Sequence, residues 1–102
     1  MDKFVPIGQA SDIGEGKLKQ VQIAGAKVAI AHVAGSFYAL GDTCTHLGCS
    51  LSAGKLEGTA VTCPCHGSRF DVTSGAVLRG PARKPEPSHR VEVRDGALWL
   101  EV

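Results

Sequence analysis

Two short segments of this chain hold the side chains best suited to chemistry. Residues 44–49 read CTHLGC and residues 63–70 read CPCHGSRF, and we call them the first and the second box. They contain all four cysteines and two of the four histidines of a 102-residue chain. Thiolates and imidazoles are protein ligands that bind zinc and iron readily. The clustering of these residues therefore predicts a metal centre.

Each box offers one Cys and one His at close spacing, in the pairs Cys44 with His46 and Cys63 with His66. Two thiolates and two imidazoles suit either a tetrahedral zinc ion or a two-iron, two-sulfide cluster whose irons carry different ligands. Structural zinc sites more often pair like ligands within each arm. Zinc would also leave the thiols of Cys49 and Cys65 without a role. The residues alone leave both centres open, although this arrangement is less usual for a structural zinc module.

The two boxes resemble the cluster-binding loops of Rieske [2Fe-2S] proteins. The resemblance implies one [2Fe-2S] cluster per chain, with four iron ligands: Cys44, His46, Cys63 and His66. It also implies that the two remaining cysteines, Cys49 and Cys65, form a disulfide between the loops, as in the high-potential branch of the family.

The same resemblance assigns three further residues to tuning the cluster. Ser68 stands where the family places a hydroxyl that donates to a bridging sulfide. Phe70 stands where high-potential members carry a Tyr that donates to a cysteine sulfur, so this chain departs from them at that position. Without this donor the reduced sulfur is stabilised less. The reduction potential is therefore expected to be lower than in the Tyr-bearing members, but still inside the Rieske range. Leu47 is expected to shield the cluster.

Helical periodicity is absent, and short alternating runs broken by Gly-containing turns indicate an antiparallel all-β protein. Strands are expected at residues 4–7, 18–23, 27–33, 37–40, 60–62, 70–72, 76–78, 89–94 and 97–102. Asp95-Gly96 between two alternating runs is the strongest hairpin signal. The resemblance spans nearly the whole chain and implies a single Rieske domain, residues 1–102. Its fold is an antiparallel β-sandwich with a smaller cluster-binding lobe at about residues 43–80.

The segment that follows the lobe is the only Pro-rich stretch, residues 80–87. One interpretation is a linker that crosses back to the other strands, and the resemblance implies a rigid loop that covers the cluster; both can hold together. Four basic residues lie in or beside the lobe, Arg69, Arg79, Arg83 and Lys84. Ordinary solvated charges are the favoured interpretation, with a weak basic rim for an acidic partner as the second.

Two thiolates and two neutral imidazoles leave an oxidised two-iron cluster neutral, whereas four thiolates would give it a charge of minus two. An electron is therefore added more easily, and the expected chemistry is one-electron transfer rather than catalysis. The resemblance implies a soluble carrier that takes electrons from a flavoprotein reductase and passes them to an oxygenase or similar terminal enzyme. The alternative is the small Rieske subunit of a larger oxidoreductase, of the nitrite reductase or arsenite oxidase type.

Composition argues against other partners. The formal net charge is +1, from 11 basic and 10 acidic residues, which does not suggest a nucleic-acid or membrane surface. No apolar run approaches the roughly 18 residues of a transmembrane helix. The first ten residues lack the apolar core of a secretory signal, so a cytoplasmic location is expected. A disulfide would argue weakly against it, because disulfides are uncommon in the cytosol.

Overall fold

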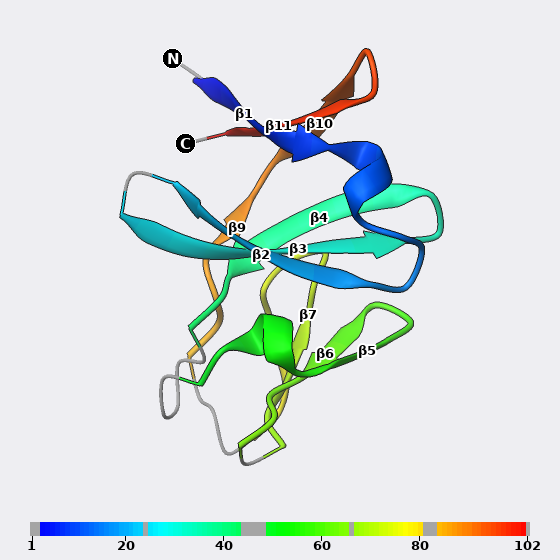
Figure 1. The fold of residues 1–102 in the computed structure, drawn as a ribbon. Helices are drawn as coiled ribbons and strands as arrows, with labels where there is room; N and C mark the ends of the chain where they lie inside the picture. The colour runs from blue at the N-terminus through cyan, green and yellow to red at the C-terminus, as the bar shows by residue number, and fades with distance from the viewer. Residues whose placement is uncertain (1–2, 24, 44–48, 66, 81–83, 102) are drawn as a thin grey trace.

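The computed structural model describes residues 3–23, 25–43, 49–65, 67–80 and 84–101. The described residues form antiparallel strands in three sheets, together with two single-turn 3-10 helices. Figure 1 shows the sheets stacked, with the sheet of the chain ends at the top and the lobe at the bottom. In the described residues no helix is long and apolar enough to cross a membrane.

The first sheet joins the two ends of the chain. Strand β1 (Phe4–Gln9) pairs with β11 (Ala97–Glu101), which pairs with β10 (Val91–Arg94). Asp95 and Gly96 both have positive φ, at 50° and 78°, which matches the turn that an Asp-Gly pair favours between two strands. The predicted closing hairpin is therefore present at the Asp95-Gly96 turn.

The second sheet contains β2 (Leu18–Ile23), β3 (Ala26–Val33), β4 (Ser36–Gly41) and the two-residue strand β9 (Ser88–His89), in that order. The strand predicted at residues 89–94 is divided between two sheets. His89 pairs with β4, whereas Val91–Arg94 pairs with β11. Strands commonly switch sheets at the corner of a sandwich, and a period-two pattern continues through such a switch unchanged.

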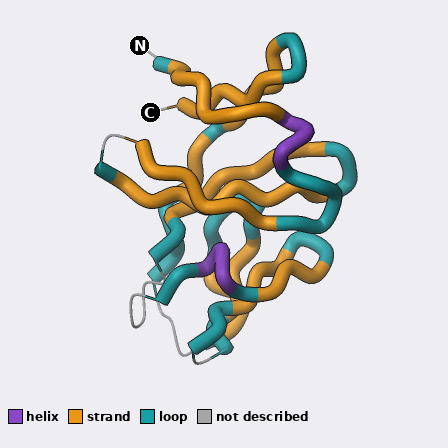
Figure 2. The backbone as a smooth tube through the Cα atoms, in the orientation of Figure 1, coloured by secondary structure: helices purple, strands orange, loops and turns teal. Residues whose placement is uncertain are grey.

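Strand β3 is buried on both faces, because the second sheet lies between the first sheet and the lobe (Figure 2). One set of its residues packs toward the chain ends in a core of Ile13, Val28, Ile30, Ala39, Leu98 and Leu100. The alternate residues, Ala29 and Ala31, pack toward the lobe. Small residues on the second face let the lobe sheet approach closely, which fixes the lobe against the sandwich.

The lobe sheet has four short strands, β5 (Lys55–Glu57), β6 (Ala60–Thr62), β7 (Arg69–Asp71) and β8 (Val77–Arg79). The 3-10 turn η2 (Leu51–Ala53) precedes it, and the other turn, η1 (Ala10–Asp12), follows β1. One face of the sheet packs on the second core cluster, whose buried members are Ala29, Ala31, Leu40, Leu51, Val61, Cys63, Phe70 and Val72. This sheet lies within the lobe expected at residues 43–80.

Candidate metal centre

The first box follows β4, and a buried carboxylate closes the loop that carries it. Asp42 is 1% exposed, and its Oδ2 accepts hydrogen bonds from Ser50 Oγ at 2.6 Å and from Gln20 Nε2 at 2.5 Å. Its Oδ1 accepts one from the backbone N–H of Ser52 at 2.7 Å. Thr43 and Ser50 also form an isolated β-bridge. The two ends of the segment containing the box are thus held together.

Two opposing effects set the pKa of Asp42. Burial is the largest and raises it, because a charge is less stable away from water. The hydrogen bonds from Ser50, Gln20 and Ser52 favour the ionised form, and together they hold the pKa below its usual value of 3.8. Asp42 is therefore a charged acceptor at neutral pH, which strengthens each of its hydrogen bonds.

The second box begins directly after β6, and its last two residues, Arg69 and Phe70, are the first two residues of β7. Strand β6 runs directly into Cys63, whose backbone N–H donates to the carbonyl of Ser68 at 2.7 Å, and Gly67 N–H donates back to the carbonyl of Cys63 at 3.3 Å. Cys63 is 3% exposed and Ser68 is fully buried. The backbone thus turns tightly, which brings the cysteine at the start of the box beside the Ser68 that follows it.

A disulfide between Cys49 and Cys65 joins the two boxes, with their Cα atoms 6.4 Å apart. The sulfur atoms of Cys49, Cys63 and Cys65 all lie within 4.8 Å of one another. Two of these sulfurs are bonded to each other, so they are not thiolates available to a metal. Among the described cysteines, Cys63 is the free one.

This donor set fits the expected cluster better than it fits zinc. The disulfide gives a role to the two cysteines that a zinc site would leave over, and it lies beside the free thiol of Cys63. The other three expected ligands, Cys44, His46 and His66, lie outside the described residues, as does Leu47. The full ligand set therefore stays a prediction.

Phe70 has a structural role that the sequence analysis missed. It is fully buried in β7, in the same core cluster as Cys63, Leu40 and Leu51. It therefore joins the site to the sandwich, in addition to the tuning role expected from its position. The sequence did carry a signal for this role. Phe70 and Val72 alternate with polar Asp71, which is the pattern of a strand with one buried face, and both are buried in this cluster.

The described part of the Pro-rich stretch runs from the lobe back to the second sheet, as the linker interpretation expected. Glu86 donates its backbone N–H to the carbonyl of Gly75 at 2.8 Å, and the carbonyl of Pro87 accepts the N–H of Gly41 at 2.8 Å. Gly75 has φ of 81°, and a Cβ there would overlap the carbonyl oxygen of Glu86. This glycine, like Asp42, was not identified from the sequence as important.

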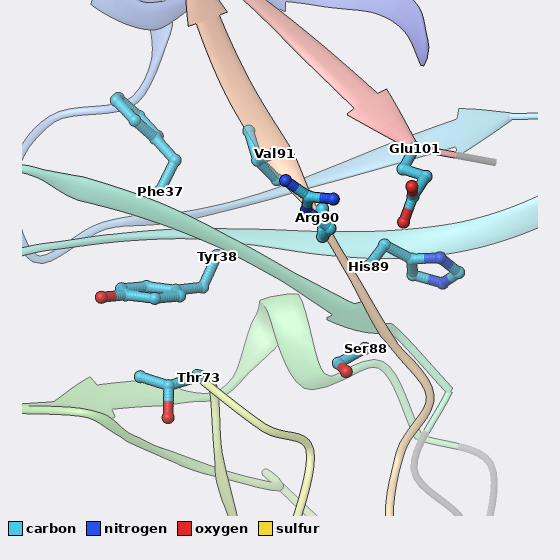
Figure 3. A pocket seen from close by; sticks show the side chains of 8 residues that line it. All are labelled: Phe37, Tyr38, Thr73, Ser88, His89, Arg90, Val91 and Glu101. Carbon is cyan, nitrogen blue, oxygen red and sulfur yellow. The ribbon is translucent and has the colours of Figure 1, made fainter. Parts of the chain in front are cut away.

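The two described histidines lie away from the cysteines. His32 contacts the carbonyl of Ile13 through Nδ1 at 2.9 Å and stacks on Phe37. His89 lines an open hollow of about 340 Å³, with Tyr38, Thr73 and Ser88 (Figure 3). Among the described residues, neither histidine belongs to the group of cysteines that could hold a metal ion, and no cysteine lines the hollow beside His89.

Comparison with known proteins agrees with this geometry. Residues 3–94 match the family model described as the Rieske [2Fe-2S] domain. The chain is 38% identical to ferredoxin CarAc of Metapseudomonas resinovorans, over 95% of this chain and 92% of the relative. It is 34% identical to the ferredoxin component of the naphthalene 1,2-dioxygenase system of Pseudomonas putida, over 98% of this chain and 96% of the relative.

A solved structure supports the same assignment. A chain from the complex of reduced oxygenase and oxidized ferredoxin in carbazole 1,9a-dioxygenase superposes with a TM-score of 0.91. It is 36% identical, and the alignment covers 96% of this chain and 92% of the other. The antiparallel β fold predicted from the sequence is confirmed by the three sheets and by this likeness.

Proposed function

The chain belongs to the Rieske [2Fe-2S] domain family, and we propose that it is a one-electron carrier which receives electrons from a flavoprotein reductase and delivers them to an oxygenase. The observation that carries this proposal is the arrangement of three cysteines. Cys63 is free and buried beside the Cys49–Cys65 disulfide, which ties the two boxes together. A bound [2Fe-2S] cluster would supply reversible one-electron chemistry at this position.

The proposed ligands are Cys44 and Cys63 on one iron and His46 and His66 on the other, with one cluster per chain. Thiolates and imidazoles segregate between the irons in this cluster type. The Asp42 network and the Cys63–Ser68 hydrogen bond support this assignment, because they hold the ends of both boxes in place. The proposed tuning residues are Leu47, Ser68 and Phe70.

The proposed partners follow from the relatives. CarAc is named as a ferredoxin, the Pseudomonas putida relative as the ferredoxin component of a dioxygenase system, and the solved complex pairs a ferredoxin with an oxygenase. Each of them has nearly the same length as this chain, so the likeness extends over the whole carrier. We include in the proposal that the carrier is soluble and works in the cytoplasm.

A second candidate is the small Rieske subunit of a larger oxidoreductase. The Cys49–Cys65 disulfide favours it to some extent, since the resemblance places such a disulfide in the high-potential branch of the family. The two candidates differ in one measurable property. A carrier exchanges between partners and is isolated alone, whereas a subunit remains with a large catalytic chain through gel filtration at high salt.

The proposed function is tested by redox titration of the purified, coloured protein. We expect uptake of one electron per chain from dithionite, full reoxidation by ferricyanide, and an EPR signal of low average g in the reduced form. Replacing Cys63 by Ser, or His66 by Ala, should remove that signal, whereas His32→Ala should keep it because His32 lies outside the site. A colourless protein that binds one zinc ion per chain would contradict the proposal.

A further inference from the structure

One face of the lobe sheet carries a line of basic side chains. The strand register places Lys55 opposite Thr62, Thr62 opposite Arg69, and Arg69 opposite Arg79. Residues directly opposite each other in antiparallel strands point to the same face of the sheet. Lys55, Arg69 and Arg79, which we call the basic row, therefore cross all four strands on one face. At a strand spacing of about 4.8 Å the row is roughly 14 Å long.

The basic row is on the solvent side of the sheet. The neighbouring residues Leu56, Val61 and Phe70 belong to or pack against the buried core cluster, as does Val77, which pairs with Phe70 and is separated from Arg79 by Leu78. Because side chains alternate between faces, the row points the other way, and Lys55 and Arg79 are exposed. The register shift in β8 lies beside the row, at Leu78, which is 54% exposed.

The row reaches the second box. Arg69 is part of that box, and Thr62, which lies opposite Arg69, directly precedes the first residue of the box, Cys63. Two acidic residues, Glu57 and Asp71, lie at the opposite end of the same face. Each is directly opposite Ala60, on either side of β6. The face is therefore positive beside the box and negative away from it. Such a field directs an approaching anionic surface toward the box end.

A hollow of about 370 Å³ lies on this face, lined by Glu57, Thr62, Gly67, Arg69, Arg79 and Gly80. The Nε of Arg69 is buried, and no residue in the described part of the chain accepts a hydrogen bond from it. Two arginines directly opposite each other repel, and among the described carboxylates none forms an ion pair with either. A carboxylate placed between them would relieve the repulsion, and a guanidinium binds a carboxylate through two parallel hydrogen bonds.

We propose that the basic row is the docking surface for an acidic patch on the protein that accepts the electron, with a carboxylate of that partner in the hollow between Arg69 and Arg79. The exposed side chain of Leu78 supplies an apolar contact at its margin. This inference rests on the proposed function, because it places the partner beside the second box, whose residues would hold part of the cluster. From the sequence, the favoured interpretation of Arg69 and Arg79 was ordinary solvated charges. The proposal instead adopts the second interpretation, a basic rim for an acidic partner.

The first test measures the approach of charged electron acceptors to the reduced protein by stopped flow. The probes are ferricyanide, an anion, and tris(phenanthroline)cobalt(III), a cation. We expect Arg79→Glu and Lys55→Glu each to slow oxidation by ferricyanide by about threefold or more at low salt and to speed oxidation by the cobalt complex. Both differences should shrink at about 0.5 M salt, where screening leaves a Debye length of only a few ångströms.

The control is Lys3→Glu, which makes the same change in net charge on the exposed N-terminal segment next to β1, on the far side of the sandwich from the lobe (Figure 1). It should leave both rates near those of the unmodified protein. Glu57→Gln removes the one acid that lines the hollow, so it should raise the ferricyanide rate. Equal effects of Lys3→Glu and Arg79→Glu would show a global charge effect and overturn the proposal.

The second test uses a fluorescent octaglutamate peptide as a mimic of an acidic patch, with octalysine as its counterpart. Fluorescence anisotropy at low salt should show octaglutamate binding that Arg79→Glu weakens at least threefold and Lys3→Glu does not. Binding that is unaffected by Arg79→Glu and Lys55→Glu would overturn the proposal. The redox titration separates the two hypotheses, since a protein that takes up one electron but shows no such charge dependence is still a carrier.

Discussion

Ser50 donates its hydroxyl to the carboxylate of Asp42 at 2.6 Å across the base of the segment that carries the first box. Asp42 follows the last residue of β4, and Ser50 precedes the turn η2, so this contact ties the sandwich to the lobe. Gln20, from β2, donates to the same oxygen. One buried charge thus links the loop after β4, the residue before η2 and strand β2, which gives the base of the first box a polar support.

The first prediction is that Asp42→Asn destabilises the protein and loosens the first box. An amide has one acceptor oxygen and no charge, so at least one of the three donors around it loses its partner. A lost charged hydrogen bond with a buried partner costs about 2–3 kcal/mol. Urea unfolding should show that loss, and the visible absorption should decay faster under a chelator. Asp12→Asn, at an exposed acid that accepts one backbone bond, should have a much smaller effect.

The same substitution should change the dependence of stability on pH. The folded-state pKa of Asp42 lies below its ordinary value, so its contribution is present above that value and is lost as the pH falls through the folded pKa. Between about pH 5 and pH 3 the unmodified protein should therefore lose more stability than Asp42→Asn. Parallel stability curves for the two proteins over that interval would contradict the role assigned to Asp42.

Much of the fold follows from local patterns in the sequence. The alternation in residues 18–23 and the Asp95-Gly96 turn predict their strands and hairpin because both depend on neighbouring residues. The switch of sheets at Arg90 and the pairing of Asp42 with Gln20 do not follow, since they depend on which distant strands lie side by side. The two box motifs predict a metal centre for a different reason, which is that metal ligands must be of particular residue types at close spacing. Of the four predicted ligands, Cys63 alone lies in the described residues, so the full set stays a prediction.

The second prediction concerns the disulfide, which closes a loop of 16 residues. The double variant Cys49→Ser/Cys65→Ser should lose about 3 kcal/mol of stability, because its unfolded chain is less restricted. It should keep the cluster spectrum at low temperature, since neither residue is a proposed ligand. Mass spectrometry after alkylation without reductant should find both cysteines of the unmodified protein protected. Two free thiols in a protein with an intact cluster would contradict the pairing.

The third prediction is that Gly75→Ala displaces the segment 84–87. Gly75 and Gly35 both have φ of 81°, but a Cβ on Gly75 would overlap the backbone of Glu86, whereas one on Gly35 would meet nothing within 4 Å. Both substitutions cost about 1 kcal/mol for the left-handed backbone conformation. The overlap adds a further cost of about 1–3 kcal/mol to Gly75→Ala alone. Equal stability of the two variants would show that the contact with Glu86 is unimportant.

The last prediction concerns the potential, on the hypothesis that Phe70 faces a ligand sulfur. Phe70 and Cys63 are both buried in one core cluster, so a hydroxyl added at the ring edge has few polar partners other than that sulfur. Phe70→Tyr should raise the potential, because an O–H donor stabilises the more electron-rich reduced sulfur. Ser68→Ala should lower it for the converse reason. Shifts of tens of millivolts are expected, and about 59 mV corresponds to a tenfold change for one electron.

Protein-film voltammetry measures both shifts in potential. Urea unfolding then shows whether the new Tyr hydroxyl donates to the sulfur or is buried without a partner. If the Tyr hydroxyl donates to the sulfur, Phe70→Tyr should unfold at nearly the same urea concentration as the unmodified protein. If it is buried without a partner, it should lose about 1–3 kcal/mol and leave the potential unchanged. Phe70→Leu, which keeps the site apolar, should lose stability by leaving a cavity while its potential stays near that of the unmodified protein. A destabilised Phe70→Tyr with an unshifted potential would therefore reject the placement of Phe70 against the sulfur.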